Sequence, residues 1–109
     1  MSENASPNKR YQLRYLDLFE EDLNKIVDYI MHHLESPEAA ANLVSDVEEA
    51  IKKRCTCAES FEPFQSNRDR QHPYYRIYVH NYTVFYVVIG DVMEVRRILY
   101  SRRDLAELL

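Results

Sequence analysis

The chain has 109 residues, 46% of them hydrophobic and 29% charged, and a formal net charge of −4. This length fits one domain around one core, and the composition is that of an ordinary soluble globular protein. No run approaches the roughly 20 apolar residues of a membrane helix, and the polar start MSENASPNKR lacks the apolar stretch of a secretory signal. We therefore expect a cytoplasmic protein, with a disordered arm over residues 1–9 and a single domain over residues 10–109.

Charge is distributed unevenly along the chain. Residues 1–65 carry 7 Lys/Arg and 13 Asp/Glu, a net −6, whereas residues 66–109 carry 7 Arg and 5 Asp/Glu, a net +2. This asymmetry has two alternative explanations: a solvated helical surface whose charges have no role, or a basic face for nucleic acid or an acidic protein partner. Overall acidity argues against strong nonspecific nucleic-acid binding, which grows with the number of phosphates neutralised.

Hydrophobic spacing predicts a strand and then a helical hairpin. Apolar and polar residues alternate over Tyr11–Tyr15, which indicates a strand. Asp17 is expected to cap a helix over residues 18–35, with Glu20 completing a capping box. Ser36 and the following proline mark a second helix, which is expected to run to about residue 57. The connection is so short that the two helices should be antiparallel.

The rest of the chain predicts a loop, three strands and a last helix. Residues 59–73 show no periodicity, and Phe61, Pro63 and Phe64 are expected to enter the core. Two-residue turns at His80-Asn81 and Gly90-Asp91, with positive φ expected at the asparagine and the glycine, separate three strand-like runs. These runs are Tyr74–Val79, Tyr82–Ile89 and Val92–Tyr100, and a helix from Arg102 to Leu109, capped by Ser101, follows them.

These elements give an α+β fold in the order β-α-α-β-β-β-α. The helical hairpin should cover one face of an antiparallel sheet, because neither layer can bury its apolar residues alone. The middle of the three final strands is apolar on both faces and is expected to be central. The other face of the sheet, with Arg76 and Tyr78, should be partly open.

No motif predicts a cofactor or a metal. Cys55 and Cys57 have no second pair to complete a zinc site and are expected to be reduced. His32 and His33 are adjacent on a helix and point in different directions. The chain also lacks a glycine-rich phosphate loop and an H-E-x-x-H sequence.

The amino-acid sequence of the C-terminal third of the chain resembles the RelE/ParE superfamily of bacterial toxins from type II toxin–antitoxin systems, which includes plasmid stabilisation proteins. Tyr75-Arg76 and the run Asn81–Tyr86 resemble the family's arginine-bearing strand, turn and aromatic strand. The run from Val95 to Asp104 resembles its closing strand and Arg-Arg-Asp sequence, and SPEAAANLVSDVEEAI resembles its second helix. The resemblance covers about residues 10–109 and implies the fold, a cognate antitoxin and possible hetero-oligomers with it.

The resemblance implies two possible targets. RelE-like members cut messenger RNA in the ribosomal A site, whereas ParE-like members poison DNA gyrase. RelE-like members place an arginine just after the turn into the aromatic strand, where this chain has Thr83. Many members have a histidine ahead of the Arg-Arg-Asp, where this chain has Tyr100. Both differences favour the ParE-like alternative.

Metal-independent RNA cleavage needs groups that move protons and stabilise phosphorane charge. The candidates for a nuclease are Arg76, Arg97, Arg103 and Tyr100. These arginines and Arg102 can stabilise phosphate charge, while Tyr100 or His72 can move protons or Glu62 can serve as a base. Each also has a structural interpretation: His72 can be a solvated loop residue, and Arg97 can form an ion pair with an acid such as Asp104. Whether the protein is an enzyme therefore stays open at this point.

Our leading hypothesis is a ParE-like toxin that binds a macromolecular target, with DNA gyrase favoured, and is neutralised by a cognate antitoxin. An acidic, amphipathic antitoxin segment suits an arginine-rich surface beside aromatic side chains. The alternatives are a ribosome-dependent mRNA endonuclease and a non-toxic binding module of the same fold. The residues expected to bind target or antitoxin are Arg76, Tyr78, Arg97, Tyr100, Arg102 and Arg103.

Overall fold

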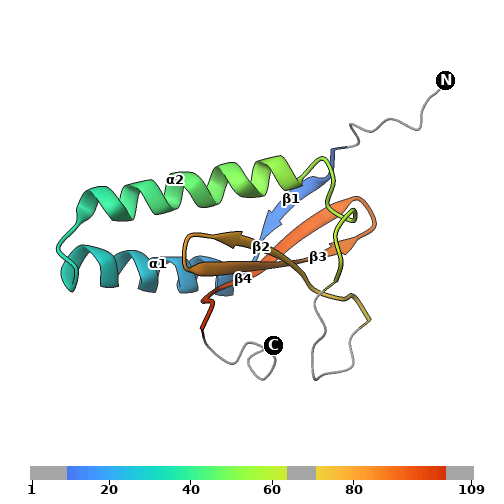
Figure 1. Cartoon of the computed structure of the whole chain (residues 1–109). Helices are drawn as coiled ribbons and strands as arrows, with labels where there is room; N and C mark the ends of the chain where they lie inside the picture. Colours follow the sequence, from blue (N-terminus) through green and yellow to red (C-terminus); the bar gives the residue numbers. More distant parts are fainter. Residues whose placement is uncertain (1–9, 64–70, 103–109) are drawn as a thin grey trace.

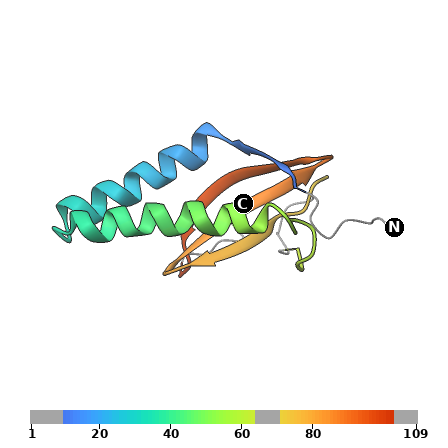
Figure 2. The same cartoon turned by 90° about the horizontal axis from the view of Figure 1, so that it is seen from above.

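The computed structural model describes residues 10–63 and 71–102. Its elements are β1 (Gln12–Tyr15), α1 (Asp17–His32), α2 (Pro37–Arg54), β2 (Tyr75–Val79), β3 (Tyr82–Ile89) and β4 (Val92–Tyr100). The two helices form a hairpin over one face of a four-stranded sheet (Figure 1, Figure 2). No helix in this part of the chain is long and apolar enough to cross a membrane.

The predicted C-terminal helix is not seen where it should begin. Ser101 and Arg102 form a turn, and residues 103–109 lie outside the described residues, as does the predicted arm over residues 1–9. Strands β2, β3 and β4 and the two helices match the predicted elements to within three residues at each end.

The sheet is mixed, so the prediction of an antiparallel sheet is wrong. The strand order is β1-β4-β3-β2, with β1 parallel to β4 and both other pairings antiparallel. The hairpin brings the chain back to the start of β1, where the Tyr11 N–H donates to the Cys55 carbonyl at 3.0 Å. Two tight turns then make β4 start at the same end, so β1 and β4 must run in the same direction.

Helix α1 begins without the predicted capping box. Leu16 is the N-cap residue and makes no side-chain cap bond, while Asp17 and Glu20 lie in the first turn, where carboxylates favour the helix dipole. The Leu16 N–H donates to the Val95 carbonyl at 3.0 Å, so the pairing with β4 holds the start of this helix. The cap of α2 is as predicted: the Ser36 hydroxyl accepts from the Ala39 N–H at 3.2 Å.

The two hairpin turns differ in how well the sequence predicts them. Gly90 has the expected positive φ of 61°. In the other turn His80, rather than Asn81, has a positive φ of 55°. His80 is the first of the two turn residues, as Gly90 is in its turn, and Asp46 on α2 holds its ring nitrogen at 2.7 Å.

Two hydrophobic clusters stabilise the sheet, one on each face. The larger lies under the helices and includes Phe19, Val47, Ile51, Val84 and Tyr86. The smaller, on the face without helices, consists of Tyr74, Phe85, Val87 and Leu99, with Ile89 packed against it. Phe61 does not enter the core as predicted; its ring is 47% exposed.

Arg54 joins the end of α2 to the sheet. Its guanidinium donates to the Arg76 carbonyl and to the Tyr86 hydroxyl, each at 2.9 Å, and lies 3.5 Å from the Phe61 ring centroid. Tyr86 in turn donates to the Ala58 carbonyl at 2.7 Å. The loop after α2 is therefore held against β2 and β3 by a cation and hydrogen bonds as well as by apolar packing.

The Tyr11 hydroxyl donates to Glu59 at 2.7 Å. That hydrogen bond, and then burial, raise the Tyr11 pKa from 10.0 to about 12. The folded state therefore holds this proton more tightly than the unfolded chain, and the resulting stabilisation is full below pH 10.0 and lost as the pH rises toward about 12.

We predict that Tyr11→Phe makes the fall in unfolding free energy over this pH range shallower, as measured by urea titration at several pH values. Equal slopes for both proteins would contradict the assignment.

Candidate functional site

The face of the sheet without helices carries arginines from three strands, of which Arg14 is exposed and Arg76 and Arg96 are partly buried. We call this the arginine face and define it by Arg14 on β1, Arg76 and Tyr78 on β2, and Glu94 and Arg96 on β4. It surrounds the smaller hydrophobic cluster, because Phe85 pairs with Arg76 and Val87 pairs with Glu94. In Figure 1 this face lies on the side of the sheet opposite α1 and α2.

Glu94 organises two of these arginines. Its side chain is only 8% exposed and accepts from Arg14 Nε at 3.0 Å and from Arg96 at 2.9 Å. A buried carboxylate needs such partners, because an unpaired charge away from water is strongly disfavoured. The three side chains together keep a net charge of +1, and Arg14, at 53% exposure, presents it to solvent.

Arg96 occupies an irregularity in β4. The pairing register shifts between Phe85 and Tyr86, so that β4 contains one residue more than β3 at this point. Such a bulge redirects side chains, and here the Arg96 guanidinium lies 5.9 Å from the Tyr74 ring centroid. Burial alone lowers the Arg96 pKa, but hydrogen bonds to Tyr74 and Glu94 outweigh it and leave the pKa raised. The residue is a fixed cation at the centre of the face.

Arg76 and Tyr78 extend the face onto the edge strand β2. Tyr78 is 65% exposed, and the Arg76 guanidinium lies 5.7 Å from its ring centroid. An exposed aromatic ring beside a cation can stack on a planar group or pack against an apolar side chain. The structure therefore places these two predicted binding residues together, as expected.

Arg97 is engaged in a structural ion pair. Its guanidinium donates to both carboxylate oxygens of Asp22 on α1, at 2.7 and 3.1 Å. The hydrogen bond to Asp22 raises the Arg97 pKa despite partial burial. The predicted structural role is thus confirmed, but its partner is Asp22 rather than Asp104, which lies outside the described residues. Because the Asp22 carboxylate balances its charge, Arg97 offers little net positive charge to a ligand.

The other predicted site residues are dispersed. Tyr100 lies on the side of the helices, where its ring meets that of Tyr82 at a centroid distance of 5.8 Å. Arg102 is exposed in the turn after β4, and Arg103 lies outside the described residues. Thr83 is fully buried, with its hydroxyl 2.7 Å from that of Ser101, so it has a structural role.

This arrangement favours binding over acid–base chemistry. Among the described residues, the proton-transfer candidate Tyr100 is on the opposite side of the sheet from Arg76, and Arg97 is paired. Within residues 10–63 and 71–102, no three His, Cys, Asp or Glu side chains gather closely enough to hold a metal ion. What the arginine face offers is positive charge, an exposed ring and an apolar centre.

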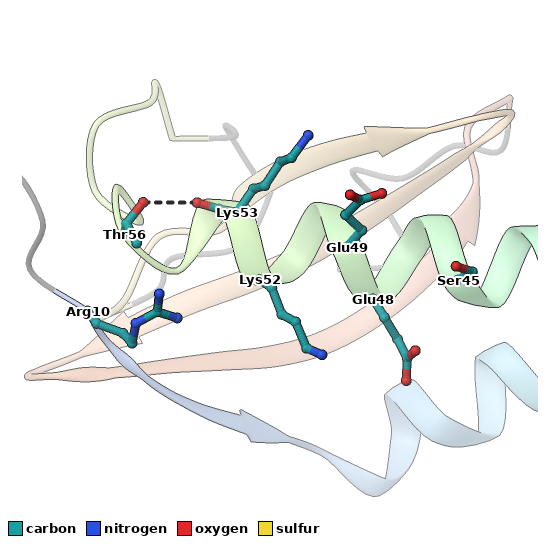
Figure 3. Close-up of a pocket in the computed structure, with 7 residues that line it drawn as sticks. All are labelled: Arg10, Ser45, Glu48, Glu49, Lys52, Lys53 and Thr56. Carbon is teal, nitrogen blue, oxygen red and sulfur yellow. Dashed lines mark hydrogen bonds between the residues drawn. The ribbon is translucent and has the colours of Figure 1, made fainter.

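A concave surface separate from the arginine face runs along the outside of α2, with a volume of about 750 Å³ (Figure 3). Its charges are mixed, since Arg10, Lys52 and Lys53 line it together with Glu48 and Glu49. The glutamates stand four residues before the lysines, which is the favourable order for pairs on a solvated helix. These mixed charges favour solvation of α2 over recognition of one ligand charge.

Sequence reasoning missed Arg14, Glu94 and Arg96. The alternation in β1 and β4 contains the signal, since Arg14 and Glu94 are polar residues between apolar ones. Two features make this signal hard to see in the sequence. The bulge interrupts the alternation of polar and apolar residues at Arg96, and the parallel pairing that places Arg14 opposite Glu94 is not visible in the local sequence. Arg97, the neighbour of Arg96 in sequence, is the residue that sequence reasoning selected instead.

Comparisons with known proteins identify the class. The structure is similar to a chain of the chromosomal ParDE toxin–antitoxin system from P. aeruginosa, with a TM-score of 0.68 and 21% identity over 87% of this chain and 98% of that one. It is also similar to a chain of the archaeal RelE–RelB complex from Pyrococcus horikoshii OT3, with a TM-score of 0.51 and 14% identity over 86% of this chain and 98% of that one. At these identities the likenesses show a common fold.

The family follows from the sequence itself. The family model of the ParE toxin of the type II toxin–antitoxin system parDE matches residues 13–105. No curated protein sequence gives a significant match. Because the family model spans most of the domain, this chain belongs to the ParE toxin family of type II toxin–antitoxin systems.

The Asp22–Arg97 pair gives a stability prediction. Asp22→Ala leaves the partly buried Arg97 guanidinium and the buried Ile98 N–H without the partner that they have in the native fold. We expect the unfolding free energy to fall by about 3–5 kcal/mol in urea titrations. The matched control is Asp46→Ala, which removes a half-exposed carboxylate paired with His80 and should cost about 1 kcal/mol or less. Equal losses in the two variants would show that Asp22 has no special structural role.

Proposed function

We propose that this protein is a ParE-like toxin that arrests growth by binding a macromolecular target through the arginine face, with DNA gyrase as the favoured target. A cognate antitoxin neutralises it. The proposal rests on the family membership together with the chemistry of this face. It extends the family assignment, which by itself fixes neither the target nor the surface used.

The observation that carries the proposal is the engagement of Arg97 by Asp22, at 2.7 and 3.1 Å. A nuclease that works without a metal needs cations aimed at the phosphorane and a proton donor or base within reach of the same atoms. Among the candidates that the structure describes, Arg97 is held in an ion pair, and Arg76 and Tyr100 lie on opposite sides of the sheet. Binding requires no such convergence, and the arginine face is suited to it.

Similar proteins support the antitoxin part of the proposal. The two similar solved structures are described as a ParDE toxin–antitoxin system and a RelE–RelB complex. Both descriptions pair a toxin with a partner protein, and we propose the same arrangement for this chain. The surfaces available for contact include the arginine face and the exposed apolar side chains of the helical hairpin.

The purified protein is predicted to inhibit DNA supercoiling by gyrase and to leave ribosome-bound messenger RNA intact. Arg76→Ala should raise the concentration needed for half inhibition by about tenfold, because a hydrogen bond to a charged group contributes roughly 1.5–3 kcal/mol. Supercoiling is followed on agarose gels, and RNA integrity by primer extension on stalled ribosomes.

The matched control for Arg76→Ala is Lys52→Ala, which removes a cation from the outer surface of α2. This variant should inhibit as strongly as the unsubstituted protein, and circular dichroism should show that both variants are folded. Codon-positioned RNA cleavage that Arg76→Ala abolishes would replace the proposal with the endonuclease alternative. Normal supercoiling and intact RNA at high concentrations of folded protein would leave a binding module without toxicity.

A further inference from the structure

Two arginines of the arginine face are held by one carboxylate. Glu94 accepts from Arg14 through Oε2 at 3.0 Å and from Arg96 through Oε1 at 2.9 Å, so the two guanidinium groups flank it. Arg14 uses its Nε in this contact, and its terminal nitrogens donate to no other residue in the part of the chain that the structure describes. We call Arg14, Glu94 and Arg96 the arginine cradle.

The arginine cradle is ordered by the sheet itself. The parallel register places Arg14 on β1 opposite Glu94 on β4. Arg96 is held from two sides, since its guanidinium also lies 5.9 Å from the Tyr74 ring centroid. Side chains that are already ordered lose less conformational entropy when a ligand binds. The cradle therefore presents its charge in a fixed position.

The accessible groups of this face are polar, although an apolar cluster supports it. Phe85 and Val87 are fully buried, and Tyr74 and Leu99 are almost so. Protein partners commonly bury an apolar core at the centre of their interface, but these four side chains are closed to a partner. The face presents guanidinium groups and a phenol ring instead. These are the groups that bind phosphate and stack on nucleobases.

Tyr78 supplies a stacking surface near the arginine cradle. Its ring is 65% exposed, and nucleobases stack on exposed aromatic rings whatever their sequence. One strand, β3, separates β2 from β4, so the ring and the cradle are roughly 10 Å apart across the sheet. One DNA strand carries a phosphate about every 3.4 Å along its axis. A segment of a few nucleotides therefore reaches from one to the other.

We infer that the arginine face binds a segment of single-stranded DNA, with a phosphate in the arginine cradle and a base stacked on Tyr78. That the nucleic acid is DNA, presented by the target complex, rests on the proposed function. The charge complementarity is local, because the cradle carries +1 in a chain of net charge −4. The free toxin therefore binds such a strand weakly, with a Kd on the order of 10⁻⁵ M.

The test measures binding of the purified toxin to a short, fluorescein-labelled single-stranded DNA by fluorescence anisotropy at low salt. Arg14→Ala should weaken binding by about tenfold or more, because hydrogen bonds to a charged phosphate are lost. Tyr78→Ala should weaken it by about fivefold or more, because one base loses its stacking partner. The duplex of the same sequence should bind less tightly than the single strand, since paired bases cannot stack on the ring.

Glu94→Gln distinguishes a positioned pair of arginines from positive charge alone. The substitution raises the charge of the arginine cradle from +1 to +2 and keeps the size of the side chain. Attraction by charge alone would then strengthen DNA binding. The cradle predicts weaker binding, because the amide offers one acceptor oxygen in place of two and holds a guanidinium about half as strongly. Tighter binding by Glu94→Gln would overturn the role of the cradle.

Two matched controls keep the test specific. Lys52→Ala removes one positive charge from the outer surface of α2, as Arg14→Ala does from the arginine face. Tyr29→Ala removes another exposed tyrosine, which lies on α1. Both should bind the DNA strand as the unsubstituted toxin does, and thermal unfolding establishes that each variant is folded. Equal losses in the controls and in the variants of the arginine face would overturn the inference.

A supercoiling assay on the same proteins separates this inference from the proposed function. Inhibition of gyrase by a toxin that does not bind single-stranded DNA would overturn the inference and leave the proposed function standing. DNA binding that depends on Arg14 and Tyr78, without inhibition of gyrase, would uphold the DNA site and refute the proposed target. An RNA strand of the same sequence that binds more tightly than the DNA strand would overturn the assignment to DNA.

Discussion

Asp22 holds helix α1 to strand β4 where the sheet would otherwise have an open edge. Strand β1 covers β4 only as far as Val95, and beyond it the Asp22 carboxylate accepts from the Ile98 N–H at 3.1 Å as well as from both Arg97 nitrogens. A side chain thus replaces the missing strand and leaves neither the backbone donor nor the guanidinium unpaired. This contact fixes α1, the first helix of the hairpin, against β4.

The same contact determines which arginines can face a partner. The consecutive arginines Arg96 and Arg97 lie at the bulge in β4. Asp22 on α1 accepts hydrogen bonds from Arg97, and Glu94 accepts one from Arg96. The charge of Arg97 is balanced by its own carboxylate in a bidentate pair, whereas Arg96 shares a single carboxylate with Arg14. Positive charge therefore remains on the face without helices. Because of the one extra residue in β4, Arg97 forms the ion pair with α1, whereas Arg96 lies on the arginine face beside Tyr74.

Local sequence signals predicted the elements well, because hydrophobic spacing, the Ser36 cap and the Gly90 turn act within a few residues. These signals failed where a contact with a residue far away in the sequence determines the direction of a strand or the start of a helix. The parallel pairing of β1 depends on where the hairpin returns the chain, and the start of α1 depends on Val95. The prediction that Arg76 and Tyr78 lie on the open face of the sheet was right, because they alternate along β2. It missed Glu94, whose role appears only once β1 lies beside β4.

We propose that this ParE-family toxin binds its target and stops growth through DNA metabolism. The most direct test is induced expression in a bacterium that lacks the antitoxin, with incorporation of labelled thymidine and methionine followed over the first minutes. We predict that thymidine incorporation falls first, while methionine incorporation continues. An immediate loss of methionine incorporation, with thymidine incorporation maintained, would make translation the target and contradict the account.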